Sequence, residues 1–518
     1  MKKALIFAAV VLFACGAVFA NGSSEKETNV EAVPGEHIKG GEMVISTNQA
    51  FNSMFNPHTG GNAVDWGWPC LETLIYQNPG DPTWKMLLAD SCIVDKDNNS
   101  VTITIKQGVK FHNGDTLDAD DVVFSIQSWV DFGRGATIGS PSSVEKLDDY
   151  TVRITWPSFS LSFEQWIANC FIFSKTAFEE HGVDWMLTNM VGTGPYKMTE
   201  FIPDVSISYE RWDGYREPYT EGPAKIKYLY ISEDTTALAS FLSKDVTFFK
   251  TTSAETVAQL KGYGFDPQSM VGGTEFVHYA QPLTLVDNDP WANAEIRRAV
   301  YLHGIDWDAY AYALLGDIGY HTDSIGAAGC SYYKEDLEVS SLDREKAKQI
   351  ISDAGYPNGF NTKIYTAETD IASATILQSE LKKLNINAEV EVIDPSVLIN
   401  IVTGSDKRSG ILVYNLGFNT IQMDRFNKFY SYKGMFAGST NWSDEEKLYY
   451  DNAAKAKTQE EENKWLYEYV KQYVQVDSHF WPIANATRKV CYQDNLWVGE
   501  NYYCGNRGMD PAQFSFVK

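Results

Sequence analysis

Catalytic side chains occur in this chain without the spacing that catalysis requires. The sequence has no G-x-S-x-G nucleophile elbow, no H-E-x-x-H metal motif and no G-x-x-x-x-G-K-S/T phosphate loop. The run Gly192-Thr193-Gly194-Pro195 has the glycines of a short phosphate loop. Pro195 lacks a backbone N–H donor, however, and a strand-like segment begins at Tyr196. We therefore expect a structural turn at this run.

A second candidate for chemistry is an acid–base pair formed by Glu179 and His181. Their surroundings, residues 178–182 (FEEHG), are typical of an exposed helix end. The chain has 68 Asp and Glu residues, too many for paired carboxylates to be singled out. We expect no enzyme activity. A secreted hydrolase that acts on sugars is the alternative that these acids and the aromatic residues leave open.

The seven cysteines are scattered along the chain and do not predict a metal site. They form no C-x-x-C pair, and no histidine stands at metal-ligand spacing from them. We therefore predict neither a metal nor a cofactor. Cys491 and Cys504 could form a disulfide between neighbouring strands, since exported proteins can form disulfides. Buried free thiols are the alternative.

Aromatic residues are the other chemically informative feature. They make up 14% of the chain, with 14 Trp and 29 Tyr, and their rings can stack on sugars or line pockets for peptide side chains. Most must belong to the hydrophobic core. The aromatic residues whose sequence contexts indicate a loop or a lobe junction, and which we predict to contact a ligand, are Trp66, Trp68, Tyr279, Tyr414, Phe418, Trp442 and Trp481.

The first 20 residues predict export. Lys2 and Lys3 precede an apolar stretch, and residues 18–20 (VFA) have the small-x-small pattern of a signal-peptidase site. The stretch is shorter than the roughly 20 residues of a membrane-spanning helix. We expect cleavage after Ala20. Residues 12–15 (LFAC) are typical of a relaxed lipobox, so lipid attachment at Cys15 is the alternative.

The balance of charge argues against one class of partner. The chain has 43 Lys and Arg against 68 Asp and Glu, a formal net charge of −25. Nucleic acids and anionic lipids both require a basic surface, so we expect no direct binding to either. The length of 518 residues predicts two or three lobes.

The elements that must position these residues are predicted from periodicity and from turn residues. An early strand begins at residue 41, a β-meander covers 98–117 and a helix with acids in its first turn follows at 118–129. Later segments alternate between helix and strand, which predicts an α/β lobe with a partly parallel sheet. They are a helix at 343–355, a strand at 362–366, a helix at 371–384, a strand at 388–393 and a last helix at 460–474.

Four blocks of the sequence resemble the oligopeptide-type (family 5) extracellular solute-binding proteins of ABC importers. The most specific covers 105–122 and is similar to the family's "LR-x-GVKFHDG-x-P-x-TA-x-DV" stretch. Before it stands LLAD at 87–90. The other three blocks follow in family order: VGTGPY at 191–196 with the aromatic residues up to 215, EIRRAVYLHGID at 295–306, and 343–360 with its AGYP.

The resemblance implies an α/β, two-lobe periplasmic-binding-protein fold (large, cluster C type) with a hinged cleft and an additional domain inserted in the N-terminal half. It also implies a monomer that delivers solute to the permease and ATPase subunits of an ABC importer; a receptor that signals to a sensor kinase is an alternative. The expected parts are a signal peptide (1–20), a linker (21–37), lobe I (38–70, 188–285 and 482–518), the inserted domain (71–187) and lobe II (286–481).

The solute is predicted from one departure from the family pattern. Peptide-binding members have Gly-Trp and, three residues after the Trp, an Asp that holds the peptide's ammonium group. Here Phe418 takes the place of the Trp and Ile421 that of the Asp. Asp424 could take the place of the family's Asp if the alignment with the family pattern is shifted. Peptides and oligosaccharides therefore both remain candidate solutes.

Overall fold

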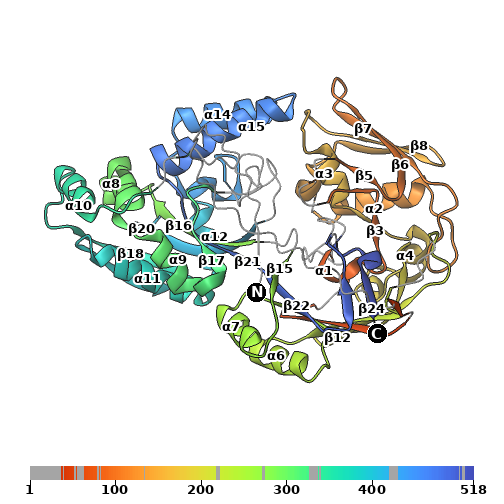
Figure 1. Ribbon diagram of the computed structural model, residues 1–518. Helices are drawn as coiled ribbons and strands as arrows, with labels where there is room; N and C mark the ends of the chain where they lie inside the picture. The colour runs from red at the N-terminus through yellow and green to blue at the C-terminus, as the bar shows by residue number, and fades with distance from the viewer. Residues whose placement is uncertain are drawn as a thin grey trace, which may run out of the picture. The chain divides into compact units, whose positions relative to one another are not determined.

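The computed structural model describes residues 37–517, apart from 39, 49, 52–53, 55–63, 79–80, 82, 134, 218–221, 271–274, 326–336, 338–339, 419–429, 501 and 504–507. Helices alternate with strands over much of this range, and most strands belong to three larger sheets (Figure 1). The predicted export signal, with Cys15, lies outside the described residues. None of the described helices is long and apolar enough to cross a membrane.

A seven-stranded sheet forms the centre of the first lobe. Its strands, in order across the sheet, are β11 (Tyr196–Ile202), β12 (Ser206–Arg211), β13 (Lys225–Tyr230), β2 (Glu42–Thr47), β14 (Phe248–Thr251), β22 (Lys489–Tyr492) and β15 (Gln268–Ser269). Both β13 and β14 run parallel to β2. Helices α6 (Asp234–Leu242) and α7 (Ala254–Gly262) supply Phe241 and Leu260, which pack against Val44. Strand β2 is therefore buried on both faces, as central parallel strands are.

A four-stranded antiparallel sheet lies in the chain between β2 and β11. Its strands, in order, are β6 (Ala89–Asp95), β7 (Ser100–Ile105), β9 (Thr151–Thr155) and β8 (Ser143–Asp148). The predicted meander is reduced after β7 to a single bridge between Lys110 and Thr116, around Gly114 with φ of +97°. The predicted helix is α2 (Ala119–Asp131), and Asp118 and Asp121 form a reciprocal capping box at its start.

Shorter elements complete the part of the chain that holds these two sheets. The short strands form one three-stranded sheet and two pairs, and the short helices lie near them in the chain. They are β1 (His37–Ile38), β24 (Phe514–Val517), β23 (Leu496–Val498), β3 (Glu72–Thr73), β10 (Phe171–Ile172), β4 (Ile75–Tyr76), β5 (Lys85–Met86), α1 (Val64–Gly67), α3 (Phe163–Ala168), α4 (Lys175–His181) and α5 (Val183–Met186).

A six-stranded mixed sheet forms the centre of the second lobe. Its strands, in order, are β17 (Gly319–Tyr320), β21 (Trp481–Thr487), β16 (Glu275–Leu283), β20 (Gly410–Phe418), β18 (Phe360–Thr366) and β19 (Ile386–Val392). Strand β18 runs parallel to β19 and β20, whereas β16 runs antiparallel to β20 and β21. The prediction of a partly parallel sheet is therefore confirmed.

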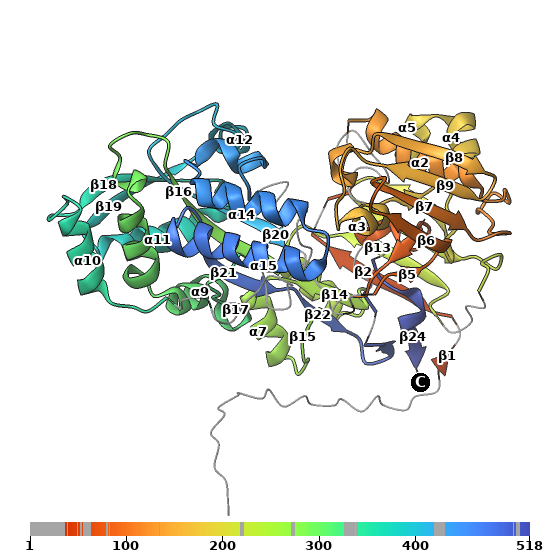
Figure 2. The ribbon, with the colours of Figure 1, turned by 90° about the horizontal axis from the view of Figure 1, so that it is seen from above.

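Helices cover both faces of the six-stranded sheet. The helices of this lobe include α8 (Ala294–Ala299), α9 (Trp307–Leu315), α10 (Arg344–Asp353), α11 (Ile371–Lys382), α12 (Pro395–Val402), α14 (Asp444–Lys455) and α15 (Gln459–Val470). Figures 1 and 2 show α14 and α15 side by side over the strands. On α11 the predicted stripe buries Ala374, Leu377 and Leu381. Gly355 follows α10 with φ of +102°, a conformation that favours glycine, and so accounts for the predicted helix stop.

The chain passes between the two lobes at two places. One connection joins β15 to β16, and the other joins β21 to β22 through Arg488. The two connections are linked by a hydrogen bond from the Met270 N–H to the Arg488 carbonyl (2.8 Å). The sheets place β16 and β21 entirely in the second lobe. The crossings therefore lie between β15 and β16 and between β21 and β22, whereas the expected bounds of 285 and 482 put β16 and most of β21 in lobe I.

Candidate functional site

Two of the sequence blocks that carry the family resemblance meet at His112. The His112 Nε2 lies 2.9 Å from the Gly194 carbonyl, and the Gly192 N–H points to His112 Nδ1 at 3.4 Å. A Cβ on Gly192 would lie 1.9 Å from the Cys70 carbonyl oxygen, and one on Gly194 would lie 2.7 Å from the Pro69 carbonyl oxygen. The glycines thus permit close backbone packing. The turn predicted at this run is confirmed.

The same contacts make His112 a determinant of stability against acid. Burial lowers the pKa of His112 from 6.5 to about 4, so the unfolded chain takes up the proton first as pH falls. The native state should therefore lose stability between pH 6.5 and 4, by about 3 kcal/mol from this group. Urea unfolding at pH 7 and pH 4.5 measures the loss. In His112→Gln the pH dependence should shrink; an unchanged pH dependence in this variant would rule His112 out as its source.

A buried ion pair fixes the adjoining part of the first lobe. The Arg216 guanidinium binds the Glu72 carboxylate in a bidentate manner, with Nη1 to Oε2 at 2.6 Å and Nη2 to Oε1 at 2.9 Å. Thr193 and Tyr215 donate further hydrogen bonds to the same carboxylate, each at 2.9 Å. The Glu72 side chain is 2% exposed and that of Arg216 is 17% exposed. This network joins β3 to two segments more than 100 residues away.

Most of the predicted ligand-contact aromatic residues lie in the two hydrophobic cores. Trp66 and Trp68 belong to the core of the first lobe, and Tyr279, Tyr414 and Trp481 belong to that of the second. The structure brings Tyr279 and Tyr414 together across β16 and β20, with ring centroids 5.9 Å apart. All five side chains are at most 7% exposed. Their role as ligand contacts stays a prediction. Burial in the hydrophobic cores does not favour it.

The remaining predicted site residues are more exposed or are not described. Trp442 is half-buried and stacks on Tyr473, with ring centroids 5.1 Å apart. The side chain of Phe418 and the whole of Asp424 lie outside the described residues.

The pair Glu179 and His181 has the exposed position that its surroundings predict. Both side chains lie at the end of α4, where Glu179 is 3.6 Å from Lys175 and His181 is 3.8 Å from Glu180. Glu179 and His181 form no ion pair with one another in the described structure. Nothing in this arrangement encloses a substrate.

The described cysteines are free thiols. Cys70, Cys170 and Cys491 are buried, and Cys92 is half-buried. Burial raises the pKa of the Cys92 thiol to about 12 and that of Cys491 to about 11, so both remain protonated and unreactive. Cys504 lies outside the described residues, and Cys491 is unpaired. The alternative of buried free thiols therefore holds for Cys491.

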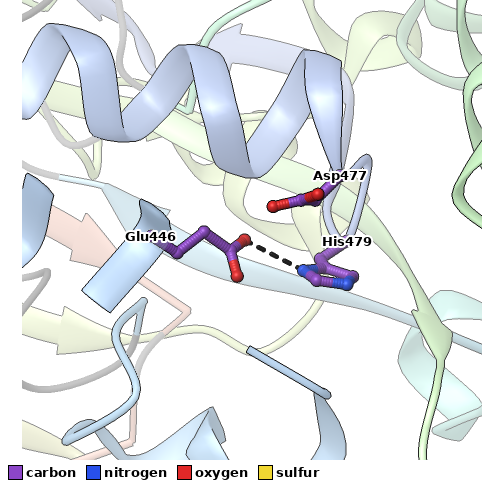
Figure 3. Close-up of side chains that lie close together, drawn as sticks. All are labelled: Glu446, Asp477 and His479. Atoms are coloured by element: carbon purple, nitrogen blue, oxygen red, sulfur yellow. Dashed lines mark hydrogen bonds and ion pairs between the residues drawn. The ribbon is translucent and has the colours of Figure 1, made fainter. Parts of the chain in front are cut away.

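A polar cluster that the sequence did not predict lies between α14 and the start of β21 (Figure 3). Glu446, Asp477 and His479 bring one ligand atom each within 4.8 Å of one another. His479 Nδ1 is 2.9 Å from Glu446 Oε1, and the Ser443 hydroxyl donates to Asp477 at 2.7 Å. Arg297 adds a buried positive charge and donates from Nε to the Asp477 carbonyl at 2.8 Å. With its carboxylates hydrogen-bonded and a cation beside it, this cluster fits a structural junction better than a metal site.

A second polar cluster lies just beyond the carboxyl end of β18, beside β20 and β16. Asp370 follows β18, and its carboxylate accepts a hydrogen bond from the Asn415 amide of β20 at 2.7 Å. His278 of β16 pairs with Asn415 across the sheet, and its Nδ1 lies 3.5 Å from Asp370 Oδ1. Ligands of α/β proteins bind at the carboxyl ends of parallel strands. No motif in the sequence predicted this cluster, because Asp370 is four residues past the end of β18 and its partners come from distant strands.

Comparison with known proteins gives the same family as the sequence blocks. The family described as "Bacterial extracellular solute-binding proteins, family 5 Middle" matches this chain over residues 83–465. Similar proteins include the heme-binding protein A of Haemophilus influenzae (25% identical, 56% of this chain and 57% of the relative) and the glutathione-binding protein GsiB of Escherichia coli (24%, 65% and 66%). The oligopeptide-binding protein AppA of Bacillus subtilis is 23% identical over 77% of each chain. The chain thus spans less than two thirds of the first two relatives.

Solved structures share the fold. The ABC transporter substrate-binding protein CtaP of Listeria monocytogenes matches with a TM-score of 0.80 at 19% identity, covering 93% of this chain and all of the other. Bacillus subtilis AppA in complex with a nonapeptide gives 0.71 at 20% identity, with the same coverage. The predicted two-lobe periplasmic-binding-protein fold is confirmed. The chain belongs to family 5 of the bacterial extracellular solute-binding proteins.

Proposed function

We propose that this chain is the extracytoplasmic solute receptor of an ABC importer and that its solute is a peptide. The family assignment over residues 83–465 carries the proposal. Peptides are named for several similar proteins: AppA of Bacillus subtilis is an oligopeptide-binding protein, and DppA of Helicobacter pylori was solved with the peptide STSA. Oligosaccharide binding loses support, because five of the seven predicted stacking rings are buried in the cores.

The two chain crossings supply a mechanism for capture. Each lobe has its own sheet and its own hydrophobic core, and the connections from β15 to β16 and from β21 to β22 join them. A solute that contacts both lobes only in a closed state favours that state by its extra affinity for it. The closed receptor then delivers the peptide to a permease that an ATPase drives. No catalytic step is required of the receptor.

Binding is tested with the purified mature protein in a thermal-unfolding assay. A peptide at about 100 times its dissociation constant should stabilise the native state by about 2.7 kcal/mol. Pools of di- to nonapeptides are the probes, and cello- and xylo-oligosaccharides at equal concentration are the matched controls. Stabilisation by sugars alone would overturn the peptide assignment. Hydrolysis of a sugar by the protein would overturn the proposed receptor function and favour the alternative of a secreted hydrolase.

Export and anchoring form a separate part of the proposal. Mass spectrometry of the protein from the native cell surface or periplasm should find a mature chain that begins at Asn21. A diacylglyceryl-modified chain that begins at Cys15 would instead assign the lipid-anchored form. A chain that retains Lys2 and Lys3 would contradict export through this signal.

A further inference from the structure

Besides the two chain crossings, the lobes meet at a contact on the side away from them. Lys96 lies in the turn between β6 and β7 of the first lobe, and Lys457 lies in the connection between α14 and α15 of the second. The Lys96 Nζ donates a hydrogen bond to the Lys457 carbonyl at 3.0 Å. Figure 1 shows β6, β7, α14 and α15 in the upper part of the view and β15 and β22, which flank the crossings, below them.

The ring of Phe159, in the segment between β9 and α3, lies beside both lysines. The Lys457 Nζ is 4.2 Å from the ring centroid, and the Lys96 Nζ is 5.8 Å from it. At such distances an ammonium group is attracted to an aromatic ring. Phe159 is 7% exposed and packs edge-on against Phe163, with ring centroids 5.5 Å apart. The ring is therefore fixed in the first lobe, and the Lys457 ammonium reaches it from the second.

Local hydrogen bonds hold the two segments that carry the lysines. Asp95 accepts two backbone N–H groups of the β6–β7 turn around Lys96, each at 3.1 Å. Thr458, directly after Lys457, caps α15 by accepting the Glu461 N–H at 3.2 Å. Groups that are already positioned lose little conformational entropy when they meet. The contact can therefore contribute most of its free energy to holding the lobes together.

We propose that Lys96, Phe159 and Lys457 form a latch that holds the two lobes closed around a solute. Strand β7 belongs to the first hydrophobic core through Val101, and α15 belongs to the second through Leu466. The latch thus joins two separately packed bodies and forms only when they approach each other on the side away from the crossings. The proposal rests on the proposed function. Because the latch stabilises the closed state alone, it raises the apparent affinity for every solute by the same factor.

A double-mutant cycle between Lys457 and Phe159 tests the latch. Lys457→Met removes the ammonium but keeps an apolar stem, and Phe159→Leu keeps a buried apolar side chain but removes the ring. The probes are trialanine, the peptide STSA and pools of di- to nonapeptides, titrated into mature protein and followed by tryptophan fluorescence. Each variant should bind every probe about 2- to 5-fold more weakly than wild type. The double variant should lose less than the product of the two single losses, since both remove the same interaction.

The matched control is Lys464→Met. The Lys464 Nζ lies 5.0 Å from the Trp465 ring centroid within α15, so this variant loses the same charge and a similar ring contact without affecting the latch. Its affinities should equal those of wild type. Equal affinities of wild type and Lys457→Met, or losses in the cycle that simply multiply, would overturn the latch alone.

A second measurement separates the latch from the proposed function. Wild-type protein that binds none of the probes would overturn the proposed function. Small-angle X-ray scattering of wild type and the double variant would then test the latch by itself. The variant should have the larger radius of gyration, because its lobes are released from one another, and equal radii would overturn the latch.

Discussion

Glu72→Gln is expected to lower the free energy of unfolding by about 3 to 5 kcal/mol, because it leaves the Arg216 guanidinium buried without its counter-charge. Glutamine has nearly the shape of glutamate, so packing is preserved and the lost charge is the main change. The Glu72 side chain is 2% exposed and accepts both guanidinium nitrogens together with Thr193 and Tyr215. Urea unfolding at pH 7, followed by circular dichroism, measures the difference.

The control for this variant is a solvent-exposed ion pair in the same lobe, where water screens the two charges. Lys225 and Glu210 lie 2.8 Å apart with side chains 55% and 52% exposed. Glu210→Gln should therefore leave the free energy of unfolding close to that of the wild type. Equal losses in the two variants would show that burial does not decide the strength of the Glu72–Arg216 pair. Our account of this junction would then be wrong.

Trp481→Ala is the second large expected effect. Trp481 is fully buried, and its indole N–H donates to the Ser478 hydroxyl at 2.9 Å. Its ring packs edge-on against Trp291 and parallel to Tyr301, with centroid distances of 5.7 and 6.4 Å. Truncation opens a cavity among large rings and should cost about 3 to 5 kcal/mol. The unfolding transition of the second lobe, measured by tryptophan fluorescence and calorimetry, gives the value.

The same variant decides whether this ring has a role in binding. If Trp481 is a core residue, peptide affinity measured well below the unfolding temperature should stay within about 3-fold of wild type. Trp442→Ala, which removes a half-buried ring stacked on Tyr473, is the comparison. A large loss of affinity in Trp481→Ala with little loss of stability would restore the original prediction that this ring contacts the ligand.

Local sequence determined the family and the regular elements. The capping residues Asp118 and Asp343 and the glycine after α10 act within a few residues of their own position, so the helices could be predicted. The glycine run at 192–194 also revealed a turn, since Pro195 removes a donor that a phosphate loop would use. Each of these features depends on short-range sterics and hydrogen bonds.

The assignment of strands to the two sheets could not be predicted from the sequence, because sheet membership is not local. Strand β16 follows β15 in the chain but pairs with β20 and β21, and β21 pairs with β16 before the chain returns to β22. A periodicity of apolar residues gives a strand but not its partners. Only the pairing of strands in the two sheets places one crossing between β15 and β16 and the other between β21 and β22.

Tertiary structure alone decided which chemical groups meet. The aromatic content suggested stacking surfaces, but ring burial depends on packing against distant segments, as with Tyr279 between Tyr414 and Phe480. The Asp370 carboxylate, the Asn415 amide and the His278 imidazole come from three strands or loops whose order along the chain does not predict contact. Parallel strands bring their carboxyl ends together whatever their separation in sequence. The sequence thus determined what kind of protein this is, and the fold determined which of its distant polar and aromatic groups meet.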